Sequence, residues 1–181
     1  YAKFFLNQKI YIGAQNCYHK DNFGANTGSV SPFMIKSVGA KYVIVGHSDN
    51  RSDGDTDAML KSKVENSLKN KLKVIFCIGE NLAEKNKNRT FKVLKKQIDN
   101  VLEKKFNCSD IIVAYEPIWS IGTGKIPEAK DLIKTTVFIK KTLKNIFKKP
   151  KSPAVLYGGS VDSENIGDFK NLNEIDGFLI G

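Results

Sequence analysis

Short apolar runs rich in β-branched residues recur along the chain and alternate with segments of helical periodicity. Each run is continuously apolar, which is typical of a strand buried on both faces of a parallel sheet. The runs are about 25 to 45 residues apart, enough for a helical crossover between parallel neighbours. We therefore predict strands near residues 10–14, 42–46, 73–79, 110–115, 154–158 and 177–181.

Helix signals lie between these strands. Ser31 and Pro32 predict the cap and first turn of a helix that Gly39 ends, and residues 56–68 predict a second. Two later apolar stripes at helical spacing consist of Phe91, Leu94, Ile98, Val101, Leu102 and Phe106, and of Leu132, Ile133, Val137, Leu143 and Phe147. The alternation indicates one α/β domain over residues 1–181, with a parallel sheet.

Polar or glycine residues follow nearly every predicted strand. A doubly wound sheet concentrates its site at one switch point, whereas a closed barrel gathers residues from all its strands at one mouth. We therefore favour a barrel, with a site drawn from Gln15, Asn16, His47, Ser48, Cys77, Glu80, Glu116, Gly158, Gly159, Ser160 and Gly181.

The composition excludes several other classes of protein. The chain has 181 residues and a net charge of +10, but Arg51 and Arg89 are its only arginines, so we expect a solvated lysine-rich surface and no nucleic-acid partner. Its apolar runs are too short to cross a membrane. The three cysteines form no Cys-x-x-Cys pair, which argues against a metal site and for a reducing, intracellular compartment.

Glu116 and His47 are the strongest candidates for catalysis. Glu116 leaves a buried strand just before Pro117, and partial burial there would make its carboxylate a useful base. His47 ends another strand ahead of a short helical turn, whose positive dipole end favours a neutral imidazole. Taken alone, a strand-end glutamate paired with lysine and a hydrogen-bonded core histidine explain the same residues equally well.

Two glycine-containing segments are candidates for ligand binding. Residues 118–125 could close over a ligand, with Trp119 as an anchor and Gly122 presenting its N–H. Gly158, Gly159 and Ser160 are predicted to open a helix over residues 161–169, whose first N–H groups could bind phosphate. A simple turn without a ligand explains the second segment equally well.

These segments resemble the triosephosphate isomerase family. Residues 114–125, Ala-Tyr-Glu-Pro-Ile-Trp-Ser-Ile-Gly-Thr-Gly-Lys, closely resemble the family's lid. Tyr-Gly-Gly-Ser-Val at 157–161, Gly-His-Ser at 46–48, Ala-Gln-Asn at 14–16 and the strand at 177–181 resemble its other motifs, in its order. The resemblance covers nearly the whole chain and implies a TIM (β/α)8 barrel that interconverts dihydroxyacetone phosphate and glyceraldehyde 3-phosphate in glycolysis and gluconeogenesis without a cofactor or metal.

The resemblance also implies a role for individual residues. Glu116 would be the base and His47 the electrophile, while Gly122, Ser160 and Gly181 would bind the substrate phosphate. Ser48, Asp49 and Cys77 would support the base and the histidine. The implied lid consists of Pro117, Ile118, Trp119, Ser120, Ile121, Thr123, Gly124 and Lys125.

The chain departs from the family's pattern in several places. A complete barrel takes about 250 residues, so we expect strands three to eight here, the first two strands and the C-terminal end outside this chain, and an inactive protein from these residues alone. The family's catalytic Lys and Asn would lie on the absent first strand. Asp49 replaces a glutamate, Asn50 replaces an arginine and Ser120 replaces an alanine. The second lid hinge, residues 125–127, is also shorter. A catalytically reduced protein that only binds phosphate or a partner is therefore the alternative.

Residues 20–31 resemble the loop with which one subunit of the family's dimer enters the other. The resemblance implies a homodimer in which Thr27 lies at the loop tip and Phe23 anchors the interface. We expect a cytoplasmic protein, and an organellar location stays open.

Overall fold

The computed structural model describes residues 10–21, 24–169 and 171–181. Six parallel strands form one sheet in chain order: β1 (Gly13–Ala14), β2 (Tyr42–Val45), β3 (Lys73–Ile78), β4 (Ile111–Tyr115), β5 (Ala154–Tyr157) and β6 (Gly177–Phe178). Consecutive strands pair in a continuous register, with Ile44 beside Ile75 and Ile75 beside Ile112. The predicted α/β class and parallel sheet are confirmed, and the sheet amounts to a half-barrel.

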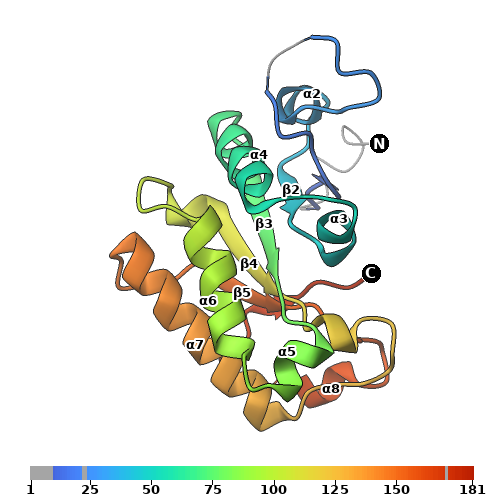
Figure 1. Ribbon diagram of the computed structural model, residues 1–181, viewed down its shortest axis with the longest axis vertical. Helices are drawn as coiled ribbons and strands as arrows, with labels where there is room; N and C mark the ends of the chain where they lie inside the picture. The colour runs from blue at the N-terminus through green and yellow to red at the C-terminus, as the bar shows by residue number, and fades with distance from the viewer. Residues whose placement is uncertain (1–9, 22–23, 170) are drawn as a thin grey trace.

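Helices connect the strands (Figure 1). They are α2 (Pro32–Ser37), α3 (Ser48–Ser52), α4 (Asp57–Lys69), α5 (Leu82–Asn86), α6 (Thr90–Val101), α7 (Ala129–Phe147) and α8 (Ile166–Phe169), with single 3-10 turns η1 (Cys108–Asp110) and η2 (Ile118–Ser120). Ser31 caps α2 and Thr56 caps α4, each through a side-chain oxygen that accepts a backbone N–H, so both predicted starts are confirmed. The apolar stripe was predicted to extend to Phe106, but α6 ends at Val101. Phe106 is nevertheless buried.

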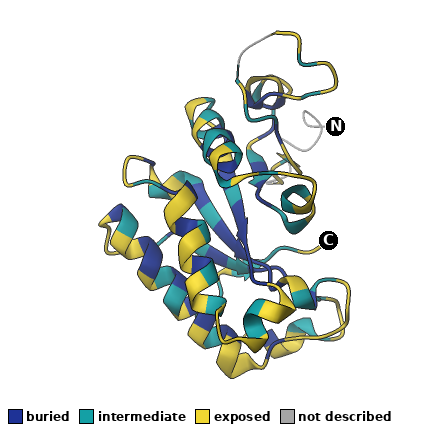
Figure 2. Ribbon diagram, in the orientation of Figure 1, coloured by how far each residue is buried: buried dark blue, intermediate teal, exposed yellow. Residues whose placement is uncertain are grey.

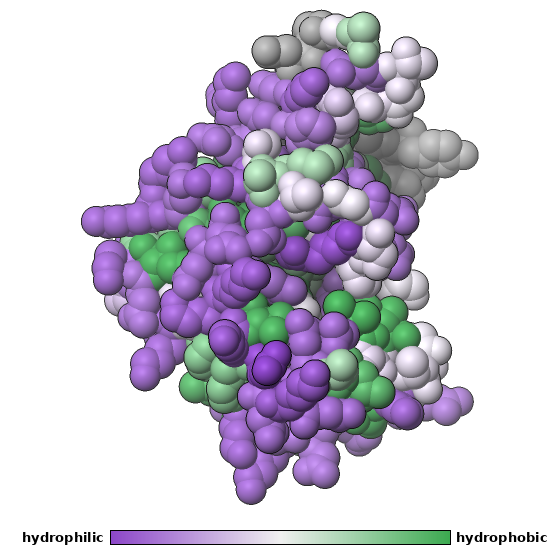
Figure 3. Space-filling view, viewed as in Figure 1, coloured by the Kyte–Doolittle hydropathy of each residue, from purple (hydrophilic) through white to green (hydrophobic). Residues whose placement is uncertain are grey.

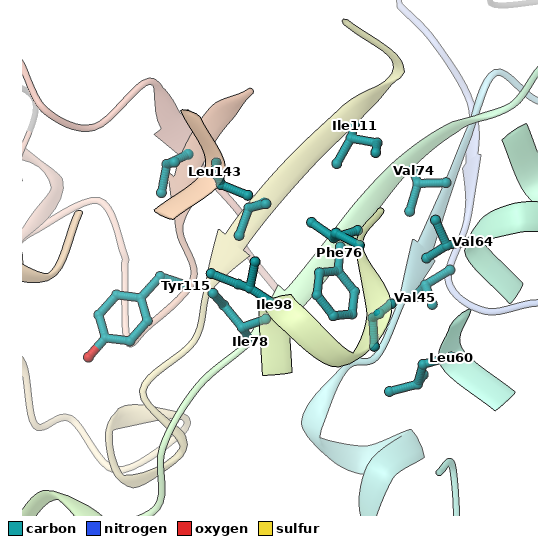
Figure 4. Close-up of a cluster of buried hydrophobic side chains, with 14 of the residues drawn as sticks. Val45, Leu60, Val64, Val74, Phe76, Ile78, Ile98, Ile111, Tyr115 and Leu143 are labelled. Carbon is teal, nitrogen blue, oxygen red and sulfur yellow. The ribbon is translucent and has the colours of Figure 1, made fainter. Parts of the chain in front are cut away.

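The hydrophobic core lies between one face of the sheet and the helices. Helix α4 packs on β2, β3 and α6, while α6 packs on α7. Figure 4 shows strand residues such as Phe76 and Ile78 meeting Leu60, Ile98 and Leu143 from these helices. The helices' outer surfaces are exposed and largely hydrophilic, as expected for the lysine-rich segments (Figures 2 and 3).

The opposite face of the sheet is less covered than the sequence predicts. In β2 and β5 buried residues alternate with half-buried ones, and in β3 and β4 only the carboxyl-terminal ends are buried on both faces. The apolar side chains Ile44, Ile75, Ile112 and Leu156 are therefore only half-buried. Burial on both faces was the wrong prediction for these positions, because no described helix packs on that side.

Candidate active site

A cavity of about 770 Å³ lies at the carboxyl ends of the strands. It brings together segments that are far apart in the sequence. Its lining includes Gln15, Asn16, Ile44, His47, Asp49, Asn50, Glu116, Ile121, Gly122, Gly124, Gly158, Gly159, Ser160, Val161, Asp162, Leu179, Ile180 and Gly181. None of the described residues that line the cavity is lysine or arginine.

Glu116 enters this cavity directly from the end of β4. Its N–H donates to the Ile78 carbonyl at 2.8 Å, which continues the β3–β4 pairing by one residue. Gly158 leaves room for its side chain, since a Cβ there would lie 2.8 Å from Glu116 Cγ. The carboxyl is only 4% exposed. Burial raises the pKa of Glu116 to about 7, although His47 and the Cys77 thiol act in the opposite direction.

His47 lies opposite this carboxyl and caps α3, so the predicted helical turn is confirmed. Its Nδ1 accepts the Asp49 N–H at 3.3 Å, and its Nε2 lies 3.6 Å from Glu116 Oε1. The Asp49 carboxylate is also 3.4 Å from Nδ1, but it is 83% exposed. We therefore assign Nδ1 as the acceptor of the fixed backbone N–H, which places the ring proton on Nε2, facing the cavity.

The supporting residues occupy different positions around this pair. Cys77 is fully buried, and burial raises the pKa of its thiol, as does the neighbouring Glu116. Asp49 lines the cavity, whereas Ser48 is not among its described lining residues. Arg51 was missed by the sequence prediction as a site residue. Its guanidinium donates to the carbonyls of Gly46 at 2.8 Å and Cys77 at 3.0 Å and so ties the His47 loop to β3.

The lid segment has one side on the cavity and the other on α5. Ile121, Gly122 and Gly124 line the cavity, and both glycines have positive φ, 64° and 70°. Trp119 is not among the described lining residues of the cavity, and its indole N–H donates to the buried Glu80 carboxylate, at 2.9 Å from Oε1. The Lys85 ammonium lies 3.2 Å from the centre of the same ring.

Glu80 was predicted to belong to the site at the strand ends, but it is not among the described residues that line the cavity, and Lys85 was not a predicted site residue. Glu80 is 1% exposed, and burial raises the pKa of its carboxyl, while the hydrogen bonds from Trp119 and Tyr115 act in the opposite direction. The two residues lie on the chain about 35 positions before the lid. Nothing in their local sequence indicates that they meet Trp119.

The predicted phosphate ligands Gly122, Ser160 and Gly181 all line the cavity. A helix was predicted over residues 161–169; its end is confirmed, but its start is wrong, because α8 begins only at Ile166. The Asp162 carboxylate accepts the N–H groups of Glu164 and Asn165 and forms a turn there instead. Phosphate binding at this edge would rest on loop N–H groups.

Other predicted features fall outside the cavity. Thr27 lies in an exposed turn, and Phe23 is outside the described residues. In the part of the chain that the structure describes, no cluster of three His, Cys, Asp or Glu side chains is arranged to hold a metal. Across the same residues, no helix combines the length and apolar character that a membrane span needs.

The fold and the site define an α/β protein with a parallel half-barrel and a buried carboxyl that faces an imidazole at the strand ends. Comparison with known sequences gives the family. The triosephosphate isomerase family model matches residues 1–181. Similar curated proteins, each named triosephosphate isomerase, include those of Thermodesulfovibrio yellowstonii (39% identity over 99% of this chain and 74% of the relative), Finegoldia magna (41%, 97% and 72%) and Thermoanaerobacter pseudethanolicus (39%, 95% and 71%). The chain belongs to the triosephosphate isomerase family.

Proposed function

We propose that Glu116 and His47 are the acid/base pair of an aldose–ketose isomerase acting on triose phosphates. Glu116 takes a proton from the carbon next to the substrate carbonyl and returns it to the neighbouring carbon. His47 donates from Nε2 to the oxygens of the enediolate. The observation that supports this proposal most directly is that a buried carboxyl and a cavity-facing imidazole lie 3.6 Å apart. Triosephosphate isomerase is itself the standard illustration of this pairing.

The substrate phosphate would bind between the lid and the loop after β5. Gly122, Ser160 and Gly181 line the same cavity, and their backbone N–H groups can donate to phosphate oxygens without a helix. Dihydroxyacetone phosphate and D-glyceraldehyde 3-phosphate both carry this group next to the reacting carbons. This arrangement supports their interconversion through an enediolate.

We further propose that the six strands are the third to the eighth of an eight-strand barrel. Ile44, Ile75 and Ile112 are paired neighbours on the half-buried face. In a closed barrel this row would be interior and covered. Such a barrel would also remove the free edges of β1 and β6.

The 181 residues alone should be inactive. A phosphorylated substrate needs a fixed cation, and the described cavity lining supplies no lysine or arginine. The alternative is a binding-only protein with reduced catalysis, which the short, exposed Asp49 side chain favours, since its carboxylate is 83% exposed. Both proposals place phosphate in the same cavity, so only turnover separates them.

The family also implies a cytoplasmic homodimer. Thr27, in its exposed turn, is the described residue that would reach the partner's site. Sedimentation velocity tests the dimer directly. A monomer at micromolar concentration would remove this part of the proposal.

The reaction is tested by initial rates of the complete gene product with D-glyceraldehyde 3-phosphate. Replacing Glu116→Gln or His47→Gln should each lower kcat by about 10²- to 10⁴-fold, because positioned acid/base catalysis contributes that much. Glu128→Gln is the control, since Glu128 is exposed and is not among the described residues that line the cavity. Turnover of the unmutated protein no faster than buffer would favour the binding-only alternative.

A further inference from the structure

Ser120 joins the two ends of the lid. It is fully buried at the end of η2, and its hydroxyl donates to the Lys125 carbonyl at 2.5 Å. Between these two residues lie the cavity-lining positions Ile121, Gly122 and Gly124. The Ser120 side chain therefore closes the glycine-bearing segment into a loop. Thr123 supports this loop, since its hydroxyl donates to the Trp119 carbonyl at 3.1 Å and accepts the Lys125 N–H at 3.2 Å.

The same residue ties the lid to the loop after β5. Ser160 Oγ donates to the Ser120 carbonyl at 2.6 Å, and Tyr157 OH lies 3.4 Å from Ser120 Oγ. The Ser160 N–H also points to Ser120 Oγ, at 3.5 Å. That contact is long and weak, so the N–H can turn to a phosphate without loss of the other two links.

The packing around these links leaves no spare room. A Cβ on Gly159 would lie 2.0 Å from Tyr157 OH and 2.8 Å from Ser120 Oγ. Within hydrogen-bond distance of Tyr157 OH lies the Ser120 hydroxyl, at 3.4 Å.

We propose that Ser120 is a positioning residue that holds the lid against Ser160 and so organises the phosphate end of the cavity. Its hydroxyl does this by linking Lys125 and Tyr157, and its carbonyl accepts the hydrogen bond from Ser160 Oγ. The proposal rests on the proposed function for its effect on turnover, but not for its effect on the lid. A neutral hydrogen bond of this kind shifts an equilibrium about threefold to tenfold.

The lid itself can be followed by fluorescence, because Trp119 is the only tryptophan of the chain and lies in the lid. Acrylamide quenching of the 181-residue chain should increase about twofold or more in Ser120→Ala, since the indole spends more time away from Glu80. Ser62→Ala is the matched control, because its hydroxyl bonds only within its own helix, to the Ala58 carbonyl. Far-ultraviolet circular dichroism identifies a variant that has simply unfolded.

Ser120→Thr keeps the hydroxyl and should return quenching at least halfway to the unmutated value. Unchanged quenching in Ser120→Ala would overturn the proposal, as would equal quenching in the alanine and threonine variants. If Ser120→Ala does not fold, Ser120→Thr decides. A folded threonine variant that is quenched as little as the unmutated protein supports the proposal, and one that is quenched much more strongly overturns it.

Turnover of the complete gene product provides the second test. In Ser120→Ala, kcat/KM for D-glyceraldehyde 3-phosphate should fall about threefold to tenfold, mainly through a higher KM. With D-glyceraldehyde, which lacks the phosphate, kcat/KM should stay unchanged. Equal losses with both substrates would contradict a role at the phosphate end. Absence of turnover in the unmutated protein would remove the proposed function but leave the fluorescence result intact.

Discussion

The two faces of the sheet differ although both are apolar. On the helix-covered face, Val74, Phe76 and Ile78 are at most 1% exposed. On the other face of the same strand, Ile75 is half-buried and Lys73 is exposed. Hydrophobic sequence alone therefore does not decide burial, since the covering element must also be present.

The proposed catalytic base lies on the less covered face. Cys77 and Glu116 continue the alternation of Ile75 and Ile112 at the carboxyl ends of the strands, where Gly158 packs against the Glu116 side chain. The helix-covered face anchors the strands, and the opposite face delivers the carboxyl. Stability and chemistry are thus divided between the two faces, and variants can test the division.

The largest effect on stability is expected when isoleucines on opposite faces of β3 are replaced by alanine. Ile78→Ala should lower the free energy of unfolding by about 2 to 5 kcal/mol, because it leaves a cavity in packed core. Ile75→Ala should cost less than half as much in the 181-residue chain. Urea unfolding of both variants measures the difference, and equal losses would contradict the assignment of faces.

The next effect concerns the charge of Glu116. Its carboxyl has a folded pKa of about 7 against an ordinary 4.5, so the folded state binds the proton more tightly than the unfolded state. The resulting stability is full below pH 4.5 and is lost as the pH rises through about 7. That loss amounts to about 3 kcal/mol.

Glu116→Gln should lack this loss. Urea unfolding at several pH values between 4 and 8 should show the stability of the variant gaining on that of the unmutated protein as the pH rises. Glu128→Gln serves as the control, since Glu128 is exposed. Parallel curves for Glu116→Gln and the unmutated protein would show an ordinary, solvated carboxyl at this position.

A smaller effect is expected where β3 and β4 approach closely beyond their ends. A Cβ on Gly79 would lie 1.7 Å from the Glu116 carbonyl oxygen, so Gly79→Ala must push the backbones apart. We expect a loss of about 1 to 3 kcal/mol in the free energy of unfolding. Gly167→Ala, where a Cβ meets open space, is the control. Thermal unfolding that is the same for both variants would disprove the close approach.

The smallest effect is expected on the outer surface of the helices. Lys95 and Asp99 form an ion pair one turn apart on α6, with the lysine side chain 58% exposed. Lys95→Ala should cost at most about 0.5 kcal/mol, because such pairs are solvated and screened. Urea unfolding at low and high salt checks this, and a loss above about 1 kcal/mol would show that the outer surface contributes more than expected.

Much of the fold could be predicted because it depends on residues that are close together in the sequence. Strand positions, the caps at Ser31 and Thr56 and the periodic stripes depend on neighbours in sequence. The half-covered face of the sheet could not be predicted, because burial depends on which elements pack there. The helix expected over residues 161–169 begins later than predicted, at Ile166, because the Asp162 side chain stabilises a competing turn.

In the candidate site, too, local sequence patterns could be predicted and contacts between distant segments could not. Glu116 and His47 stand out because each follows an apolar run and resembles a family motif. Arg51 was missed as a site residue, and Glu80 was predicted at the site without its contact to Trp119. The contacts of Arg51 with Cys77 and of Glu80 with Trp119 join segments well separated in the chain. Such contacts become visible only when the strands are placed side by side.

The pH dependence of kcat/KM in the complete gene product tests the central claim most directly. In the proposed mechanism only the ionised Glu116 carboxylate accepts the substrate proton, and burial raises the pKa of this group to about 7. We predict that kcat/KM falls about tenfold per pH unit below that value and is level above it. A rate that stays level down to about pH 5 would contradict a buried glutamate as the base.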